Sequence, residues 1–225
     1  MSTNSMADLD FISSLHRRTK RDYVGRVNAF PKAEAAKVAK QFGADYWDGD
    51  RKFGYGGYTY DGRWKSVADV LATHYRLKPG DRILDVGCGK GFLLYELTQA
   101  VPGVEVYGID ISPYAIAHAK EEVRPFLQVA NATHLPFPDH SFSLVVSLMT
   151  LHNLYCFELE HALQELERVG RQHKYLVVES YRNEEEKANL LYWQLTCETF
   201  CTPEEWAWWF KRCGYTGDHS FIFFE

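Results

Sequence analysis

Two glycine clusters are the parts of this sequence best suited to chemistry. One, RKFGYGGYTYDGRW, runs from Arg51 to Trp64, and the other, LDVGCGKGF, runs from Leu84 to Phe92. The second cluster follows a short apolar run and precedes a longer one with helical spacing. Glycine lets the backbone turn tightly and approach a ligand closely. The start of the following helix offers free N–H groups to a negative group. The second cluster is therefore the predicted nucleotide-type site.

Strand and helix patterns alternate after Trp64. This alternation of buried strands with helices of 10–15 residues is typical of a parallel sheet covered on both faces. The sequence predicts an α/β fold, a Rossmann-like doubly wound sheet of six or seven mostly parallel strands. Only five residues separate the last helix from the last strand, so the direction of that strand stays open. The predicted strands are 82–86, 104–110, 126–130, 142–148, 174–180 and 220–224, and the helices between and before them are 66–77, 91–101, 112–123, 157–169 and 202–214.

The last predicted helix, TPEEWAWWFKRCG, carries start and stop signals. Thr202 is the expected N-cap, Glu205 stands at the capping-box position, and Gly214 ends the helix. Its three tryptophans and Phe210 are expected to pack on the sheet rather than bind a cofactor.

The spacing within the second cluster separates two classes of ligand. Dinucleotide-binding folds use G-x-G-x-x-G, whereas Gly87, Gly89 and Gly91 give G-x-G-x-G, preceded by the acidic Asp85. This pattern resembles motif I of the class I S-adenosylmethionine (SAM) methyltransferases. The resemblance implies SAM as cofactor, with its amino-acid portion against this loop, and S-adenosylhomocysteine as product.

A second part of the same resemblance lies downstream. Asp110 ends the second predicted strand, 19 residues after Gly91, where a carboxylate can accept hydrogen bonds from ribose hydroxyls. The stretch VANATHLPFPDHSFSLVVSLMTLHNL resembles the family's adenine-binding turn and fourth strand. It implies that Ile111, Asn131 and Ala132 also contact the cofactor, although members often carry Asp where Asn131 stands. The resemblance covers roughly residues 66–180.

The first glycine cluster follows no strand, so a nucleotide site there lacks its structural context. It is interpreted as a lid over the pocket of the methyl acceptor, because glycines allow bending and aromatic rings exclude water. The alternative is a flexible loop whose rings pack on the domain. Arg51, Lys52 and Arg63 could hold an anionic acceptor, and Tyr58 is a further candidate.

The segment before the first strand completes the predicted organisation. Residues 7–24 and 32–42 are expected to be helices and residues 43–64 a long loop. The predicted domains are therefore 1–65, N-terminal helices with the lid loop, and 66–225, the SAM-binding methyltransferase domain.

A narrower resemblance concerns this segment together with FGADYWDGDRK before it and VESYRNE…LTCE after the fifth predicted strand. These stretches resemble small bacterial methyltransferases of capsule and surface-polysaccharide gene clusters, including those making O-methyl phosphoramidate. That resemblance implies a small anionic or hydroxylated acceptor, such as a phosphoramidate or sugar precursor in capsule biosynthesis. It favours O-methylation over N-methylation.

Methyl transfer from a sulfonium needs positioning more than activation, and positioning can contribute ~7–11 kcal/mol. A neutral hydroxyl acceptor also needs a base, whereas an anionic oxygen or free amine needs little or none. His152, after the fourth predicted strand, is the candidate base, with a structural histidine as the alternative. His74 lies within a helix and is expected to be structural. Tyr181 and Arg182 follow the fifth predicted strand and could bind the acceptor.

Composition limits the remaining function classes. The chain of 225 residues has a net charge of −5, which argues against a nucleic-acid partner. The basic run His16 to Arg21 is expected to be a solvated helix face, with an anionic partner as the alternative. No signal peptide, membrane span or metal constellation is expected. The five cysteines form no CxxC, which favours a cytoplasmic protein.

Three alternatives stay open on sequence grounds. The chain could be a non-catalytic SAM-binding regulatory protein, because the same glycines and Asp110 would serve it. It could also methylate nucleic acid or protein instead of a small molecule. A nicotinamide oxidoreductase is disfavoured by the glycine spacing. The oligomeric state is not predicted.

Overall fold

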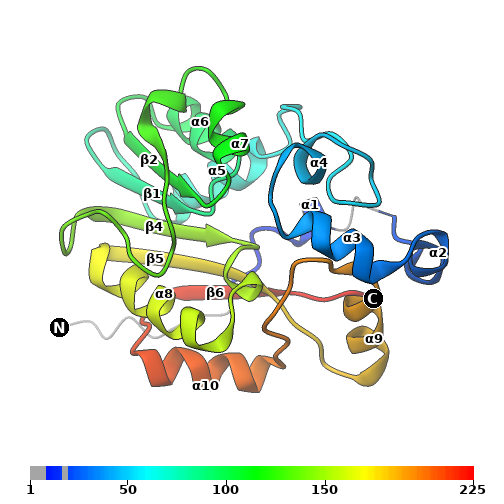
Figure 1. Ribbon diagram of the computed structural model, residues 1–225. Coiled ribbons are helices and arrows are strands. Elements are labelled where there is room, and N and C mark those ends of the chain that lie inside the picture. Colours follow the sequence, from blue (N-terminus) through cyan, green and yellow to red (C-terminus); the bar gives the residue numbers. More distant parts are fainter. Residues whose placement is uncertain (1–8, 17–19) are drawn as a thin grey trace.

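The computed structural model describes residues 9–16 and 20–225, and its centre is a six-stranded sheet (Figure 1). The strand order is β3-β2-β1-β4-β5-β6, and every neighbouring pair is parallel. The doubly wound prediction is therefore confirmed, and the last strand proves to run parallel to its neighbour. The strands are β1 (Arg82–Val86), β2 (Glu105–Asp110), β3 (Leu127–Val129), β4 (Phe142–Leu148), β5 (Gly170–Glu179) and β6 (Asp218–Ile222).

The strand order reverses between β1 and β4. In open α/β sheets a crevice forms outside the carboxyl ends of the strands at such a point, and ligands bind there. Asp85 lies in β1 and Asp110 ends β2, so the topology brings both carboxyl groups to this edge.

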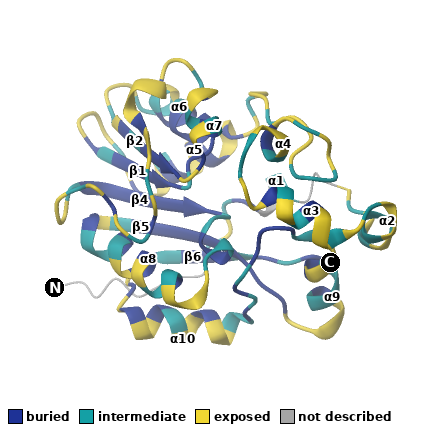
Figure 2. Ribbon diagram, viewed as in Figure 1, coloured by how far each residue is buried: buried dark blue, intermediate teal, exposed yellow. Residues whose placement is uncertain are grey.

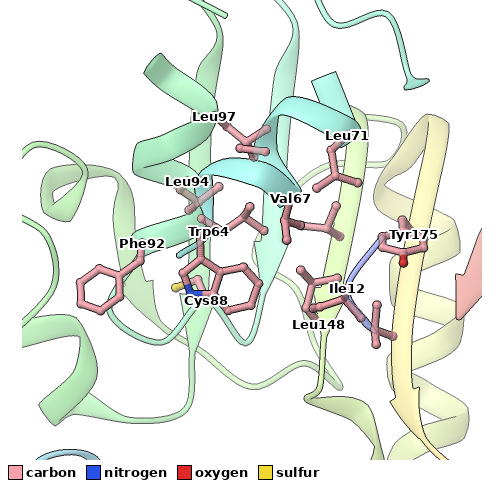
Figure 3. Packing of buried hydrophobic residues seen from close by; sticks show 14 of the residues in the cluster. Ile12, Trp64, Val67, Leu71, Cys88, Phe92, Leu94, Leu97, Leu148 and Tyr175 are labelled. Carbon is pink, nitrogen blue, oxygen red and sulfur yellow. The ribbon is translucent and has the colours of Figure 1, made fainter. Parts of the chain in front are cut away.

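Helices cover both faces of the sheet. On one face, α5 (Lys65–His74) and α6 (Phe92–Ala100) pack against alternate residues of the strands. Figure 3 shows Val67 and Leu71 of α5 beside Leu94 and Leu97 of α6 in this cluster. On the other face, α8 (Cys156–Val169) and α10 (Pro203–Cys213) cover the remaining strand residues. Strand β4 is buried along its whole length (Figure 2), which explains its continuous apolar sequence.

Helix α10 follows its sequence signals, with one exception. The Thr202 side chain accepts a hydrogen bond from the Glu205 N–H, and Gly214 closes the helix in the left-handed conformation. Trp206 and Phe210 are fully buried, as predicted, but Trp208 is 55% exposed, so that part of the prediction was wrong. Residues four apart share a helix face, whereas a residue two positions on points away from it.

The N-terminal region differs more from expectation. The predicted helix 7–24 was wrong among the described residues: α1 (Ser13–His16) and α2 (Tyr23–Ala29) are separate. Helix α2 has its own cap, because the Asp22 side chain accepts a hydrogen bond from the Gly25 N–H at 2.8 Å. Residues 1–8 and 17–19 lie outside the described residues, and with them half of the basic run His16 to Arg21.

The other differences concern element lengths and one helix that was not predicted. Helix α3 (Lys32–Ala39) ends three residues early, and α4 (Ala44–Trp47) adds a helical turn to the predicted loop. The unpredicted helix is α9 (Glu184–Trp193), which Asn183 caps. The remaining short elements are α7 (Pro113–Ala117), η1 (Arg124–Phe126) and η2 (Leu151–Asn153).

Helices α1 to α4 and α9 gather beyond the carboxyl ends of β4 and β5 (Figure 1). Helices α2 and α9, far apart in sequence, pack against each other. The edge where the strand order reverses is thus covered by segments from both ends of the chain. Among the described residues, no helix is long and apolar enough to cross a bilayer.

We expect Trp206→Ala to destabilise the protein by about 3–5 kcal/mol, because it leaves a cavity beneath α10. The indole N–H of Trp206 also donates to the Glu179 carbonyl at 3.1 Å. Urea denaturation would measure the free energy of unfolding. Trp208→Ala, on the exposed side of the same helix, should change it by less than about 0.5 kcal/mol. Equal effects of the two substitutions would contradict this packing.

Candidate functional site

Two cavities lie side by side at the carboxyl edge of the sheet. The first has a volume of about 270 Å³ and the second about 250 Å³. The first is bounded by the glycine loop (residues 87–91) and the ends of β1 and β2, and the second by α2, α9 and the end of β5. Six residues line both cavities and form their common wall: Tyr46, Tyr55, Tyr58, Trp64, Met149 and Asn153.

The glycine loop at the first cavity requires glycine for two physical reasons. Gly87 and Gly89 have φ values of 85° and 53°, which other residues rarely adopt. A Cβ on Gly87 would lie 2.1 Å from Thr150 Oγ1, and one on Gly89 would lie 2.9 Å from the ring of Trp47. Gly91 lines neither cavity; it precedes α6, and a Cβ there would meet Val123.

Asp110 holds the glycine loop to the end of β2. Its Oδ2 accepts a hydrogen bond from the Gly89 N–H and its Oδ1 one from the Ser112 N–H, both at 2.8 Å. Burial raises the pKa of Asp110, although these two hydrogen bonds act in the opposite direction. Each carboxylate oxygen can accept more than one hydrogen bond. Asp110 can therefore bind ligand hydroxyls while it keeps the loop in place.

Asp85 adds a second carboxyl group to the lining of the first cavity. It is buried at 4% exposure, and burial together with repulsion from Asp110 raises its pKa to about 8. A positively charged ligand would relieve that repulsion. The other sequence-predicted cofactor residues in this cavity are Ile111, Asn131 and Ala132, which line its far side.

An aromatic segment (residues 42–64) covers both cavities. The rings of Trp47 and Tyr55 stack at 5.2 Å, and Tyr58 stacks on Phe92 of α6 at 5.0 Å. Trp47 Nε1 also donates to Ser112 Oγ at 2.9 Å, next to Asp110. Rings of this segment therefore form much of the wall between the two cavities.

Lys90 fastens this segment to the glycine loop. Its Nζ lies 2.7 Å from both carboxylate oxygens of Asp48 and donates to the Tyr58 carbonyl at 2.9 Å. The Tyr114 hydroxyl donates to the same carboxylate at 2.9 Å. Lys90 is almost fully buried. Sequence reasoning missed this role, although a lysine inside the glycine cluster was a visible signal.

His152 and Glu179 form a buried pair at the second cavity. The Glu179 N–H donates to His152 Nδ1 at 3.3 Å, and His152 Nε2 lies 3.4 Å from Glu179 Oε2. Because Nδ1 accepts a hydrogen bond, the ring proton is assigned to Nε2, which faces Glu179. Burial lowers the pKa of His152 to about 3 and raises that of Glu179 to about 8. The imidazole is therefore neutral at physiological pH.

The sequence-predicted acceptor residues divide into two groups. Tyr58, Arg51 and Arg63 line the second cavity, and Arg63 also pairs with Asp61 at 2.7 Å. The linings of the two cavities do not include Lys52, Tyr181, Arg182 or His74.

Each residue of the second group has contacts of its own. Arg182 pairs with Glu186 and Glu225, and the Lys187 ammonium lies over the ring of Tyr181. Lys52 lies over two phenylalanine rings. His74 Nε2 lies 4.0 Å from Asp218 Oδ2.

Sequence reasoning missed other residues that line the second cavity. They come from the region of α1 and α2, from the end of β5 and from α9, and no local motif connects these segments. The residues are Arg21, Arg26, Glu179 and Trp193. Across residues 9–16 and 20–225, no group of three or more His, Cys, Asp or Glu is arranged to hold a metal ion.

Comparison with known proteins bears on the same region. Residues 84–178 match a sequence family described as a methyltransferase domain. Demethylmenaquinone methyltransferase of Symbiobacterium thermophilum is 38% identical over 108 residues, covering 44% of this chain and 41% of the relative. 27-O-demethylrifamycin SV methyltransferase of Amycolatopsis mediterranei is 32% identical over 133 residues, covering 56% and 46%. The chain thus matches less than half the length of these curated relatives.

Solved structures show the same fold. The YcgJ protein from Bacillus subtilis aligns with a TM-score of 0.53 at 19% identity, over 65% of this chain and 66% of that one.

The fold and the first cavity define a doubly wound protein with a ligand site at its strand-order reversal. The family match makes this more specific. Residues 84–178 are similar to a methyltransferase domain, and this similarity, which covers less than half of the chain, implies SAM as the methyl donor.

We expect Asp85→Asn to change how stability depends on pH. The folded chain retains a proton on Asp85 up to about pH 8, whereas the ordinary pKa is 3.8. Wild-type folding should therefore lose stability as pH rises between ~4 and ~8, and the variant should lose less. Melting temperatures of ligand-free proteins across this range would measure the difference. Asp69→Asn, on the exposed face of α5, is the control. A wild-type-to-variant difference that is independent of pH would contradict the assignment.

We expect Lys90→Met to loosen the aromatic segment, because it removes every contact of the ammonium with Asp48 and Tyr58. Limited digestion with chymotrypsin should then cut within residues 42–64 faster than in the wild type. Lys65→Met removes an exposed lysine that pairs with Asp69 and should leave the cleavage rate unchanged. Equal rates for Lys90→Met and wild type would show that other contacts hold the segment.

Proposed function

We propose that the whole chain transfers a methyl group from SAM to a small acceptor bound in the second cavity. The observation that supports this most directly is the pair of adjacent cavities with one common wall. The first has the acidic residues and glycine loop suited to SAM, and the second has the cationic residues suited to an anion. A methyl group leaving the first cavity would have only that wall to cross.

The residues of the first cavity fit SAM chemically. Asp110 would accept hydrogen bonds from the ribose hydroxyls, and Asp85 would lie near the positive charge of the amino-acid portion. Gly87 and Gly89 would allow the backbone to approach that portion. Ile111, Asn131 and Ala132 would face the adenine. SAM bound here supplies an activated methyl group.

The N-terminal region would act as the lid. We propose the division at residue 65, with residues 1–65 closing over the ligands and residues 66–225 holding the cofactor. The stacked rings of the aromatic segment would exclude water during transfer. The contact between Lys90 and Asp48 would couple closure to the glycine loop.

The second cavity indicates the kind of acceptor. Arg51 and Arg63 support a small anionic or hydroxylated metabolite, and O-methylation is favoured. A phosphoramidate or sugar precursor in capsule biosynthesis is the finer proposal, which rests on the sequence resemblance. A cytoplasmic location fits such a precursor.

Activation of the acceptor depends on its chemistry. An anionic oxygen needs no base, whereas a neutral hydroxyl does. His152 has its remaining lone pair engaged by the Glu179 N–H, so its geometry suits a residue that orients Glu179. Glu179 also lines this cavity, but its pKa of about 8 leaves it protonated at physiological pH, so it would accept a hydroxyl proton only above that pKa.

The first experiment is thermal stabilisation by S-adenosylhomocysteine. At a ligand concentration of ~100 times its dissociation constant, binding adds about 2.7 kcal/mol of stability. We expect this shift in the wild type and in Asp69→Ala, and its loss in Asp110→Ala. NAD should give no shift.

A stabilisation by NAD instead would contradict the proposal. Binding of S-adenosylhomocysteine without transfer of labelled methyl to any phosphorylated or hydroxylated metabolite would favour a SAM-binding regulatory protein. Labelling of RNA or protein would assign the macromolecular alternative.

A further inference from the structure

The second cavity has a cationic end built around one indole ring. The guanidinium carbons of Arg21, Arg26 and Arg51 lie 5.3, 4.7 and 5.3 Å from the ring centroid of Trp193. All four residues line the cavity. The segment around α2 and the segment that contains Arg51 therefore place three cations against a single ring of α9.

Two of these arginines lack a countercharge. Arg26 and Arg51 form no ion pair with any carboxylate of residues 9–16 and 20–225, and the buried Nε of Arg26 makes no hydrogen bond there. Arg26 Nη1 donates only to a neutral group, the Arg51 carbonyl, at 3.3 Å. Burial, and then repulsion from Arg51, lower the pKa of Arg26. Arginine nevertheless stays protonated, so this end of the cavity is electrostatically suited to an anion.

Another part of the same cavity holds two buried acceptor oxygens that accept no hydrogen bond, although His152 Nε2 lies 3.4 Å from one of them. Glu179 is 4% exposed, and its Oε2 accepts no hydrogen bond within the described part of the chain. Its Oε1 accepts one from Gln194 Nε2. The buried Oδ1 of Asn153 also has no partner in that part of the chain. Two buried acceptor oxygens in one cavity are costly unless a ligand donates to them.

The position of Asn153 indicates which part of a bound ligand would face the methyl donor. It is one of the six residues that line both cavities, whereas Arg26 and Arg51 line the second cavity only. The region with the two free acceptor oxygens therefore adjoins the first cavity at Asn153, and the cationic end adjoins α2 and α9.

We propose that the second cavity binds one small molecule with two groups: an anionic group held by Arg26 and Arg51, and a hydroxyl or amine that donates to Glu179 and Asn153. The inference deepens the proposed function and rests on it only in taking this molecule as the methyl acceptor. It orients the acceptor with its hydroxyl or amine toward the methyl donor and its anionic group away from it. A simple anion satisfies only half of the site.

The test compares inorganic phosphate with glycerol 3-phosphate by calorimetric titration into the protein saturated with S-adenosylhomocysteine. We expect glycerol 3-phosphate to bind at least about tenfold more tightly than phosphate, a difference of ~1.4 kcal/mol. Glycerol 3-phosphate that binds no more tightly than phosphate, or no binding of either, would overturn the proposal.

Variants separate the two halves of the site. Arg51→Gln should weaken both probes more than about tenfold, because both carry the anion. Glu179→Met should abolish the preference for glycerol 3-phosphate and leave phosphate affinity within about twofold. Asn153→Leu should have the same effect if Glu179→Met does not fold. Lys52→Gln, a cation next in sequence that lines neither cavity, should change neither affinity.

Two results would overturn the assignment of residues. Phosphate affinity unchanged in Arg51→Gln would remove the anion end, and a preference unchanged in Glu179→Met or Asn153→Leu would remove the donor end. Titration of S-adenosylhomocysteine itself keeps the proposals apart. If it binds and the probes do not, only this inference fails; if it does not bind, the proposed function fails.

Discussion

The ion pair between Lys90 and Asp48 joins the two parts of the molecule on which both cavities depend. Lys90 belongs to the glycine loop, and Asp48 belongs to the aromatic segment that covers it. Because the ammonium is buried, its partner oxygens replace water that it could not otherwise reach. The attachment positions Trp47 against Gly89 and Tyr58 against Phe92. The common wall of the two cavities follows from that placement.

The two cavities have opposite electrostatic character. The first contains Asp85 and Asp110, and burial together with repulsion from Asp110 raises the pKa of Asp85. The second contains Arg26 and Arg51, which form no ion pair with a carboxylate of residues 9–16 and 20–225. A cationic methyl donor in the first cavity and an anionic acceptor in the second would each reduce the repulsion between like charges in its own cavity. Opposite charges in adjacent sites also attract each other, so each ligand would favour binding of the other.

Burial controls the chemistry of the pair His152 and Glu179. Removal from water favours the neutral form of both groups, which explains the opposite directions of their pKa shifts. The backbone N–H of Glu179 then determines which imidazole nitrogen carries the proton. The candidate base His152 is therefore neutral at physiological pH, with Nδ1 already accepting a hydrogen bond. Glu179 and His152 both line the second cavity, and the carboxyl oxygen Oε2 accepts no hydrogen bond from the described residues.

The sequence by itself determined the fold class and the edge of the sheet where the first cavity lies. Alternating strand and helix patterns encode a doubly wound sheet, and the loop at Gly87 and Gly89 needs local backbone freedom that spacing reveals. Asp110 was identifiable because it ends a strand at a readable distance from that loop. Such features depend on neighbours in sequence.

Only the tertiary structure decided the composition of the second cavity. Arg26, Glu179 and Trp193 come from segments more than a hundred residues apart or from separate elements, and no spacing connects them. Tyr181 and Arg182 show the opposite case. They follow a strand at the correct edge, yet contacts with other side chains hold them away from both cavities. The direction of a side chain beyond a strand end depends on what packs against it, and that information is not local.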